Sequence, residues 1–375
     1  MQAGGTLMKL PPLSPSRLDA WLDAECGGDP ALPLPERLEK ARLDALRRTL
    51  KRAFSLSRRY GRTLAGYDLD LKSADDLRRL PFTTPQDLRD YREFLCVPQG
   101  DVQRIVTLQT SGSTDFPKRI AFSEGDLART ASFFAAGMAQ LVHPGERLMV
   151  LLPGAQCPDG VTDLLRQALT PSGVNVVAGQ PEASAETLRA DLSRRHPQCL
   201  VAAPHQLSSL LAAVQQDEAF RRLACCVEGI QSSGDILDAA VRDGLEQALE
   251  CVVLDHYGMT ETCFGGGVQC MARNGYHLRE LDLFLEILDP VSAEPVPDGE
   301  TGEIVLTTLN REAMPLIRYR TGDAAAWLPG PCPCGSPLRR LSSLRGRYVR
   351  IDGTPVLRLV RKGGFHAGTA ASSVF

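Results

Sequence analysis

Residues 251–261 read Cys251-Val-Val-Leu-Asp-His-Tyr-Gly-Met-Thr-Glu261, an apolar run that changes abruptly into polar residues around a glycine. Such a run predicts a buried strand whose carboxyl end opens into a loop. Similar runs precede it at 105–108, 148–152, 174–177 and 200–203. Stretches with helical spacing alternate with these runs, at 126–141, 161–169, 186–195, 206–214 and 239–249. This alternation indicates an α/β domain around a mostly parallel sheet, which binds ligands at the carboxyl ends of its strands.

The two flanks of this alternating region have a different character. Near the amino terminus, residues 1–20 are rich in proline, and helical spacing follows between Leu34 and Arg59. After Tyr276 strand signals dominate, at 282–288 and 303–308. We therefore expect four regions: a helical lead-in packed on the core over 1–100, an α/β core over 101–275, a β-rich subdomain over 276–347 and a short tail over 348–375.

Composition excludes several classes of protein. The 375 residues carry 42 Lys+Arg against 45 Asp+Glu, a formal net charge of −3, which argues against nucleic-acid binding driven by phosphate neutralisation. No stretch approaches the roughly 18 uninterrupted apolar residues of a membrane span, and no secretory signal is evident at the amino terminus. We expect a cytoplasmic protein that binds neither nucleic acid nor membrane. Its 11 cysteines, an odd number, argue against a disulfide scaffold.

A loop rich in small hydroxyl residues follows the first apolar run, where the chain reads Thr110-Ser111-Gly112-Ser113-Thr114-Asp115-Phe116-Pro117-Lys118. Hydroxyl groups around a glycine present side-chain and backbone donors together, which suits a polyphosphate. Lys118 adds a point charge. The glycine and lysine spacing is not that of a Walker A loop. Taken alone, such a cluster is more often a plain surface loop.

Two carboxylates stand at turns that follow strand-like segments. Glu261 ends the 251–261 stretch and could hold Mg²⁺, which prefers carboxylate and phosphate oxygens. Asp323 ends the segment Met314-Pro-Leu-Ile-Arg-Tyr-Arg-Thr-Gly-Asp323, where a carboxylate in a glycine turn can accept both hydroxyls of a ribose. Each segment by itself is also compatible with an ordinary solvated turn.

Taken together, these segments resemble the adenylate-forming superfamily of acyl-CoA ligases, and most closely its phenylacetate–CoA ligase-like branch. The resemblance runs in the same order from residue 40 to 353. It rests on the 110–118 loop, the 257–261 segment, Gly299-Glu-Thr-Gly-Glu-Ile-Val305, the 318–323 segment and Gly346-Arg347. It implies an α/β fold of several subdomains, with mostly parallel sheets flanked by helices and a β-rich subdomain.

The resemblance also implies roles for individual residues. The ATP phosphates would be bound by Thr110, Ser111, Gly112, Ser113, Thr114 and Lys118. The nucleotide would be surrounded further by Ser233, Gly234, Asp235, Asp255, His256, Tyr257 and Gly258, with Asp255 and Tyr257 flanking the base. Asp323 and Arg347 would hold the ribose. The catalytic set would be Lys118, Thr260 at the α-phosphate and Glu261 on Mg²⁺.

The implied reaction joins a small carboxylic acid to a thiol. An aryl or acyl carboxylate attacks the α-phosphate of ATP, and the thiol of CoA then captures the acyl-adenylate and releases AMP. Residues 151–160 are implied to line the acid pocket, although their small, mixed side chains name no acid. Two other interpretations stay open: an acyl-protein or carrier synthetase, and a degenerate nucleotide-binding protein that acts with a partner.

The chain departs from the family pattern in three places. Asp115 stands where the family usually has glycine, and Tyr348-Val349 replaces its acidic hinge pair. The family's C-terminal domain with its adenylation lysine is expected to be missing, because Lys362 is the only lysine after Lys118 and follows Arg347 too closely. We therefore expect slow adenylation unless a partner protein supplies this function.

Three thiols and an imidazole point to a metal. Cys270 and His277 border the start of the β-rich region, and Cys332-Pro-Cys334-Gly resembles a metal knuckle. Four such ligands close a tetrahedral Zn²⁺ site, which would be structural because it leaves no position open for catalysis. Buried free thiols beside a surface histidine are the alternative.

Overall fold

Apolar runs of the sequence pair as parallel strands in a computed structural model that describes residues 15–108, 117–157, 160–182 and 184–359. These strands are β3 (Arg147–Val150), β4 (Asn175–Ala178), β5 (Cys199–Ala202), β6 (Gly229–Ser232) and β7 (Val252–Tyr257). Parallel neighbours need crossover connections. The crossovers contain α5 (Val161–Leu169), the 3₁₀ turn η4 (Thr170–Ser172), α6 (Ala185–Arg195), α7 (Pro204–Gln216), α8 (Glu218–Ala224) and α9 (Ala239–Leu249).

Both faces of this parallel sheet are buried, which explains why its strands are apolar at successive positions. On one face Leu148 and Val150 join the hydrophobic cluster of α4 (Glu124–Met138) and α5. On the other face Met149 joins a second cluster with residues of α7, α8 and α9. The alternation along β3 therefore assigns its side chains to two different cores.

The strand order β4-β3-β5-β6-β7 contains a reversal. The chain runs outward from β3 to β4 and then returns, so that β5 pairs with the other edge of β3. In open α/β sheets this is the point where connections on neighbouring strands leave in opposite directions, and ligands bind there beyond the carboxyl ends. The topology thus places a crevice beside the ends of β3 and β5.

Antiparallel strands extend the sheet beyond β7. They are β8 (Gly267–Gln269), β9 (Tyr276–Leu278), β14 (Arg340–Leu341) and β13 (Trp327–Leu328), and they complete a nine-stranded sheet. A second, five-stranded antiparallel sheet holds β10 (Leu283–Leu288), β11 (Gly302–Thr308), β12 (Tyr319–Ala325), β15 (Gly346–Ile351) and β16 (Thr354–Leu359). The α/β class is confirmed, and from Tyr276 to residue 359 the described elements are all strands.

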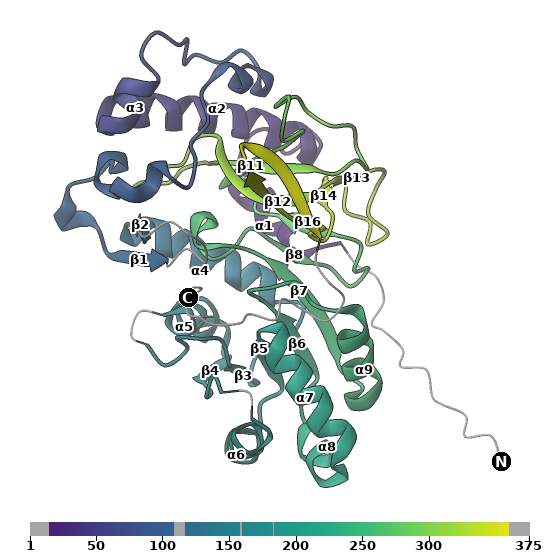
Figure 1. The fold of residues 1–375 in the computed structure, drawn as a ribbon. Coiled ribbons are helices and arrows are strands. Elements are labelled where there is room, and N and C mark those ends of the chain that lie inside the picture. The colour runs from purple at the N-terminus through teal and green to yellow at the C-terminus, as the bar shows by residue number, and fades with distance from the viewer. Residues whose placement is uncertain (1–14, 109–116, 158–159, 183, 360–375) are drawn as a thin grey trace.

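Helices near the amino terminus lie beside the five-stranded sheet, as Figure 1 shows in purple and yellow-green. They are α1 (Arg17–Cys26), α2 (Leu34–Leu56) and α3 (Arg58–Thr63), followed by 3₁₀ turns η1 (Ala74–Arg79), η2 (Asp87–Phe94) and η3 (Gln99–Asp101). A hairpin of β1 (Arg104–Leu108) and β2 (Lys118–Phe122) then leads into α4. Among the described residues, no helix combines the length and the apolar character needed to cross a membrane.

The boundary expected between residues 347 and 348 falls inside a strand. β15 begins at Gly346 and continues to Ile351, and it pairs with β12 on one side and with β16 on the other. Residues 348–359, the first part of the expected tail, are therefore part of the five-stranded sheet.

Candidate functional site

A tight turn follows β7 and directs the site residues. Gly258 is required here, because a Cβ at this position would lie 2.6 Å from both Cε1 of His256 and the carbonyl oxygen of Phe264. The 3₁₀ turn η5 (Thr260–Thr262) comes next, and the Thr262 hydroxyl accepts from the Met259 amide at 3.0 Å. Cys263 and Phe264 then adopt φ values of 56° and 66°. Two successive non-glycine residues with left-handed backbone conformations are unusual, and such residues are typical of functional sites.

The Glu261 carboxylate is buried and is held by two contacts to one of its oxygens. Its Oε1 forms an ion pair with Lys118 Nζ and accepts a hydrogen bond from the Tyr319 hydroxyl at 2.9 Å. Burial alone would raise the pKa of the Glu261 carboxyl, but Lys118 and the hydrogen bonds outweigh burial and lower it. The carboxylate is therefore charged at neutral pH, as a ligand for a hard cation must be.

Asp323 and Arg347 face each other across the paired strands β12 and β15. The Arg347 guanidinium donates to Oδ1 of Asp323 from Nε at 2.9 Å and contacts the same oxygen from Nη2 at 2.8 Å. Burial raises the pKa of the Asp323 carboxyl, and Arg347 opposes that shift. Glu261 and Lys118 also act on this pKa, so the two carboxylates belong to one electrostatic cluster.

Unpartnered polar atoms gather in the segment that follows β7. Among the described residues, the buried atoms Asp255 Oδ1, His256 Nε2, Tyr257 Oη and Thr260 Oγ1 have no hydrogen-bond partner. Buried polar groups in folded proteins are nearly always hydrogen-bonded, so each exception needs an explanation. Four of them within six residues, at the carboxyl end of a parallel strand, indicate a site that a polar ligand completes.

Of the other residues predicted to surround the nucleotide, some are buried and some are exposed. Asp255 is buried, accepts from the Tyr276 hydroxyl at 2.5 Å, and has its pKa raised to about 6 by burial. Ser233 turns toward His256, whereas Asp235 is exposed and accepts from the Ile236 amide at 2.8 Å. Gly234 follows with φ 96°, a conformation that favours glycine. The expected phosphate-binding residues 110–114 lie outside the described residues.

An apolar pocket opens at the same edge of the sheet. It has about 430 Å³ of empty space including its mouth, and Ser233 and His256 lie on its wall. Leu152, which follows β3, and Val201 of β5 also line it, so the pocket lies at the reversal of strand order. Phe133 and Phe134 of α4 and Phe264 contribute aromatic rings. Charged side chains are absent from the pocket lining in the described part of the chain.

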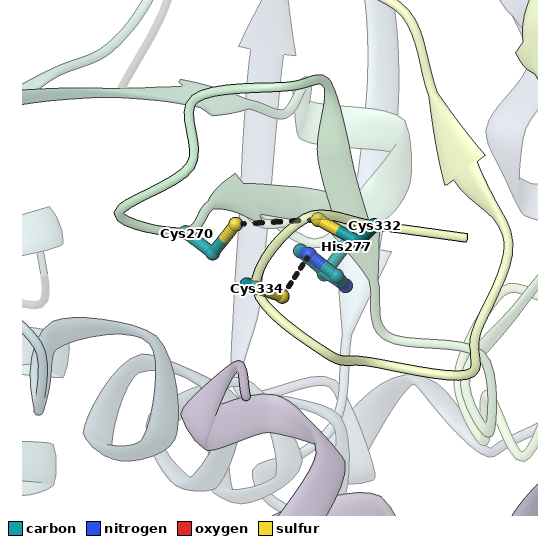
Figure 2. Close-up of side chains that lie close together, drawn as sticks. All are labelled: Cys270, His277, Cys332 and Cys334. Atoms are coloured by element: carbon teal, nitrogen blue, oxygen red, sulfur yellow. Dashed lines mark hydrogen bonds between the residues drawn. The ribbon is translucent and has the colours of Figure 1, made fainter. Parts of the chain in front are cut away.

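The predicted metal ligands come together in the β-rich region, where Figure 2 shows their side chains converging. Sγ of Cys270 lies 3.7 Å from Sγ of Cys332, and Sγ of Cys334 lies 3.6 Å from Nε2 of His277. All four ligand atoms lie within 4.8 Å of one another, and all four residues are buried. Burial, with a smaller effect of Arg340, lowers the pKa of His277 to about 4, so its imidazole is neutral.

These distances fit a zinc ion better than a disulfide. Tetrahedral bonds of about 2.3 Å to sulfur and about 2.05 Å to nitrogen imply S···S separations near 3.8 Å and S···N separations near 3.6 Å. A disulfide would require about 2.05 Å between sulfurs, and all 11 cysteines are free. The His277 Nδ1 atom has no hydrogen-bond partner among the described residues.

Two site residues were not predicted. Tyr319 lies within the motif that ends at Asp323, but its contact with Glu261 joins residues 58 positions apart. Arg311 donates to the Glu261 backbone carbonyl oxygen at 3.3 Å and thereby stabilises the turn η5. The apolar and polar alternation of residues 317–321 was the signal that Tyr319 points inward.

Comparison with known proteins decides the family. The model of a family described as AMP-binding enzyme matches residues 69–310, more than half of the chain. The chain belongs to the AMP-binding enzyme family. Within this family, it is 29% identical over 330 residues to phenylacetate-coenzyme A ligase of Pseudomonas putida, covering 83% of this chain and 71% of that one. It is 29% identical over 331 residues to the Thermus thermophilus enzyme of the same name, with the same coverage.

Solved structures agree on the fold of this AMP-binding enzyme. 2-Hydroxyisobutyryl-CoA ligase in complex with 2-HIB-AMP and CoA superposes with a TM-score of 0.73 at 24% identity. The match covers 86% of this chain and 71% of the other. The likeness in fold extends well beyond residues 69–310, and it includes the expected α/β architecture.

Proposed function

We propose that this chain is an AMP-forming acid–thiol ligase that activates an aryl or acyl carboxylate with ATP and passes the acyl group to CoA. The observation that carries the proposal is the shared location of two features. The charged cluster of Lys118, Glu261, Asp323 and Arg347 and the uncharged pocket beside His256 both adjoin the segment that follows β7. A polyphosphate and an apolar acid bound there would meet at this segment. The activity of the P. putida and T. thermophilus relatives supports this assignment.

The nucleotide would lie over the carboxyl ends of β6 and β7. Asp323 would accept the ribose hydroxyls, and Lys118 would leave Glu261 for the phosphates. Glu261 fits a Mg²⁺ ligand because its carboxylate is charged and fixed by Tyr319. A bound Mg²⁺ would neutralise charge on the phosphate oxygens. The unpartnered hydroxyl of Thr260 is a donor suited to the α-phosphate.

The reaction has two steps. A carboxylate oxygen forms a bond to the α-phosphorus while the bond to pyrophosphate breaks, which yields an acyl-adenylate. The CoA sulfur then bonds to the acyl carbon, the thiol proton is lost, and AMP leaves. Preorganised donors stabilise the charge that develops at phosphorus, and removal of one such donor typically lowers the rate by ~10²–10³.

The pocket supports an acid with an uncharged body. Its wall includes the aromatic rings of Phe133, Phe134 and Phe264, against which an uncharged acid body can pack. Residues 151–160 are expected to line an acid pocket, and one of them, Leu152, lies in the wall of this apolar pocket. A charged tail on the acid would lose its hydration without gaining a partner from the described lining.

We further propose a structural zinc held by Cys270, His277, Cys332 and Cys334. Cys270 follows β8, His277 lies in β9, and the two other cysteines stand in the turn between β13 and β14. A metal there would cross-link the antiparallel end of the nine-stranded sheet. Four protein ligands fill a tetrahedral shell, so the site has no catalytic role.

Pyrophosphate release measured with a panel of carboxylates, with and without CoA, tests the activity. We expect ATP-dependent release with apolar acids and formation of an acyl-CoA. Glu261→Gln should abolish release, whereas the matched control Glu294→Gln changes an exposed carboxylate outside the site. Release without CoA capture would favour a protein or carrier acceptor. ATP binding without release for any acid would overturn the proposal in favour of a nucleotide-binding protein.

A further inference from the structure

His256 is the polar member of an aromatic group in the apolar pocket. Its ring centroid lies 6.4 Å from that of Phe133 and 6.5 Å from that of Phe134, and all three side chains line the pocket. In β7 it shares a face with Leu254, which packs in the cluster that contains both phenylalanines. Its neighbour Asp255 instead meets Tyr276. The structure therefore places His256 at the apolar pocket and separates its side chain from that of Asp255.

One imidazole nitrogen is satisfied and the other is not. Nδ1 lies 3.1 Å from the Ser233 hydroxyl. Nε2 is buried and has no hydrogen-bond partner among the described residues. Burial, and to a smaller degree Arg279, lowers the pKa of the imidazole to about 4, so the ring is neutral at pH 7.

The Ser233 contact leaves two tautomers open. If the hydroxyl donates to Nδ1, Nε2 carries the proton and is a donor; if Nδ1 donates, Nε2 is an acceptor. A hydroxyl group can satisfy either form because it both donates and accepts. A methyl group can form a hydrogen bond with neither tautomer. A carboxylate or ammonium group would enter the uncharged pocket without a counter-charge.

We infer that the pocket selects a carboxylic acid whose apolar body carries a hydroxyl group, and that His256 Nε2 binds this hydroxyl. This inference rests on the proposed function, because it names the acid class for the same site. His256 acts as a specificity-determining residue, and Ser233 positions its ring. The unhydroxylated acid leaves Nε2 unsatisfied, which is how a polar group in an apolar pocket discriminates against it.

The test compares hydroxylated acids with methyl analogues of the same shape. The probes are 3- and 4-hydroxyphenylacetate against 3- and 4-methylphenylacetate, with kcat/KM taken from ATP-dependent pyrophosphate release. For at least one position we expect the hydroxylated acid to be preferred about ten- to a hundredfold. His256→Leu should remove this preference, and His256→Gln, which keeps a donor and an acceptor, should restore part of it. Met138→Leu, a change elsewhere in the pocket wall, should retain the preference.

Nitrogen NMR of the imidazole gives a readout independent of catalysis. A hydroxylated acid should shift the Nε2 resonance of His256, and the methyl analogue should not. Equal kcat/KM for both acids, or the same preference in His256→Leu, would overturn the inference while leaving the ligase activity standing. A hydroxyl-dependent Nε2 shift without pyrophosphate release would retain the selectivity and reject the ligase function.

Discussion

Asp323→Ala gives the sharpest test of how this chain holds a nucleotide. Both contacts from Arg347 go to Oδ1 of Asp323, and among the described residues Oδ2 has no hydrogen bond. Asp323 as a whole residue is only 5% exposed, so little water surrounds its side chain. A ribose hydroxyl that donates to this carboxylate forms a charge-assisted hydrogen bond, worth about 1.5–3 kcal/mol.

The expected loss follows from that value. At 1.4 kcal/mol per factor of ten, Asp323→Ala should weaken ATP binding roughly ten- to a hundredfold. The same loss should appear when the wild-type protein binds 2′,3′-dideoxy-ATP, because the analogue removes the donors instead of the acceptor. In the variant, ATP and the dideoxy analogue should then bind almost equally, because the carboxylate to which the ribose hydroxyls donate is already gone.

Isothermal titration calorimetry of the four combinations measures this coupling directly. Asp298→Ala is a matched control, because Asp298 is also paired with an arginine, Arg339, but is exposed. Thermal unfolding of each variant separates loss of affinity from loss of fold. If Asp323→Ala still discriminates ATP from the dideoxy analogue as strongly as the wild type, the ribose assignment is wrong.

Three further predictions concern the cation, the zinc and pH. Tyr319→Phe removes a hydrogen bond to Glu261 and should weaken Mg²⁺-dependent nucleotide binding about tenfold; an equal loss without Mg²⁺ would indicate a purely structural role. Metal analysis should find about one zinc per chain, and Cys332→Ser or Cys334→Ser should lower both the zinc content and Tm; unchanged zinc content would reject the site. His256 is neutral in the folded protein, so its contribution to stability is present above pH 6.5 and is lost as the pH falls toward 4. The free energy of unfolding, measured with urea, should decrease between pH 7 and pH 5 by about 2 kcal/mol less in His256→Leu than in the wild type. An equal decrease in both proteins would contradict the lowered pKa of His256.

Local sequence patterns determined the elements that bury both faces. Apolar runs of four or five residues predicted β3, β4 and β5 to within two residues and β7 to within three, because such runs suit strands that are covered on both faces. The same patterns placed Glu261 correctly in the turn that follows β7, whereas the turn expected at Asp323 is wrong, because Asp323 lies inside β12 and pairs with Arg347. The spacing of Cys332 and Cys334, with Cys270 and His277, predicted four ligands that the fold does bring together.

Tertiary structure alone decided which of these residues meet. β6 has a single large apolar side chain, Ile230, and is a strand because β5 and β7 pair with it on both edges. The contact between Tyr319 and Glu261 depends on how two sheets pack, which no local period encodes. The opposite surroundings of Asp255 and His256 likewise arise from neighbours on β9 and α4. Residue pattern sets the faces of each element, whereas strand order and register set which faces share a site.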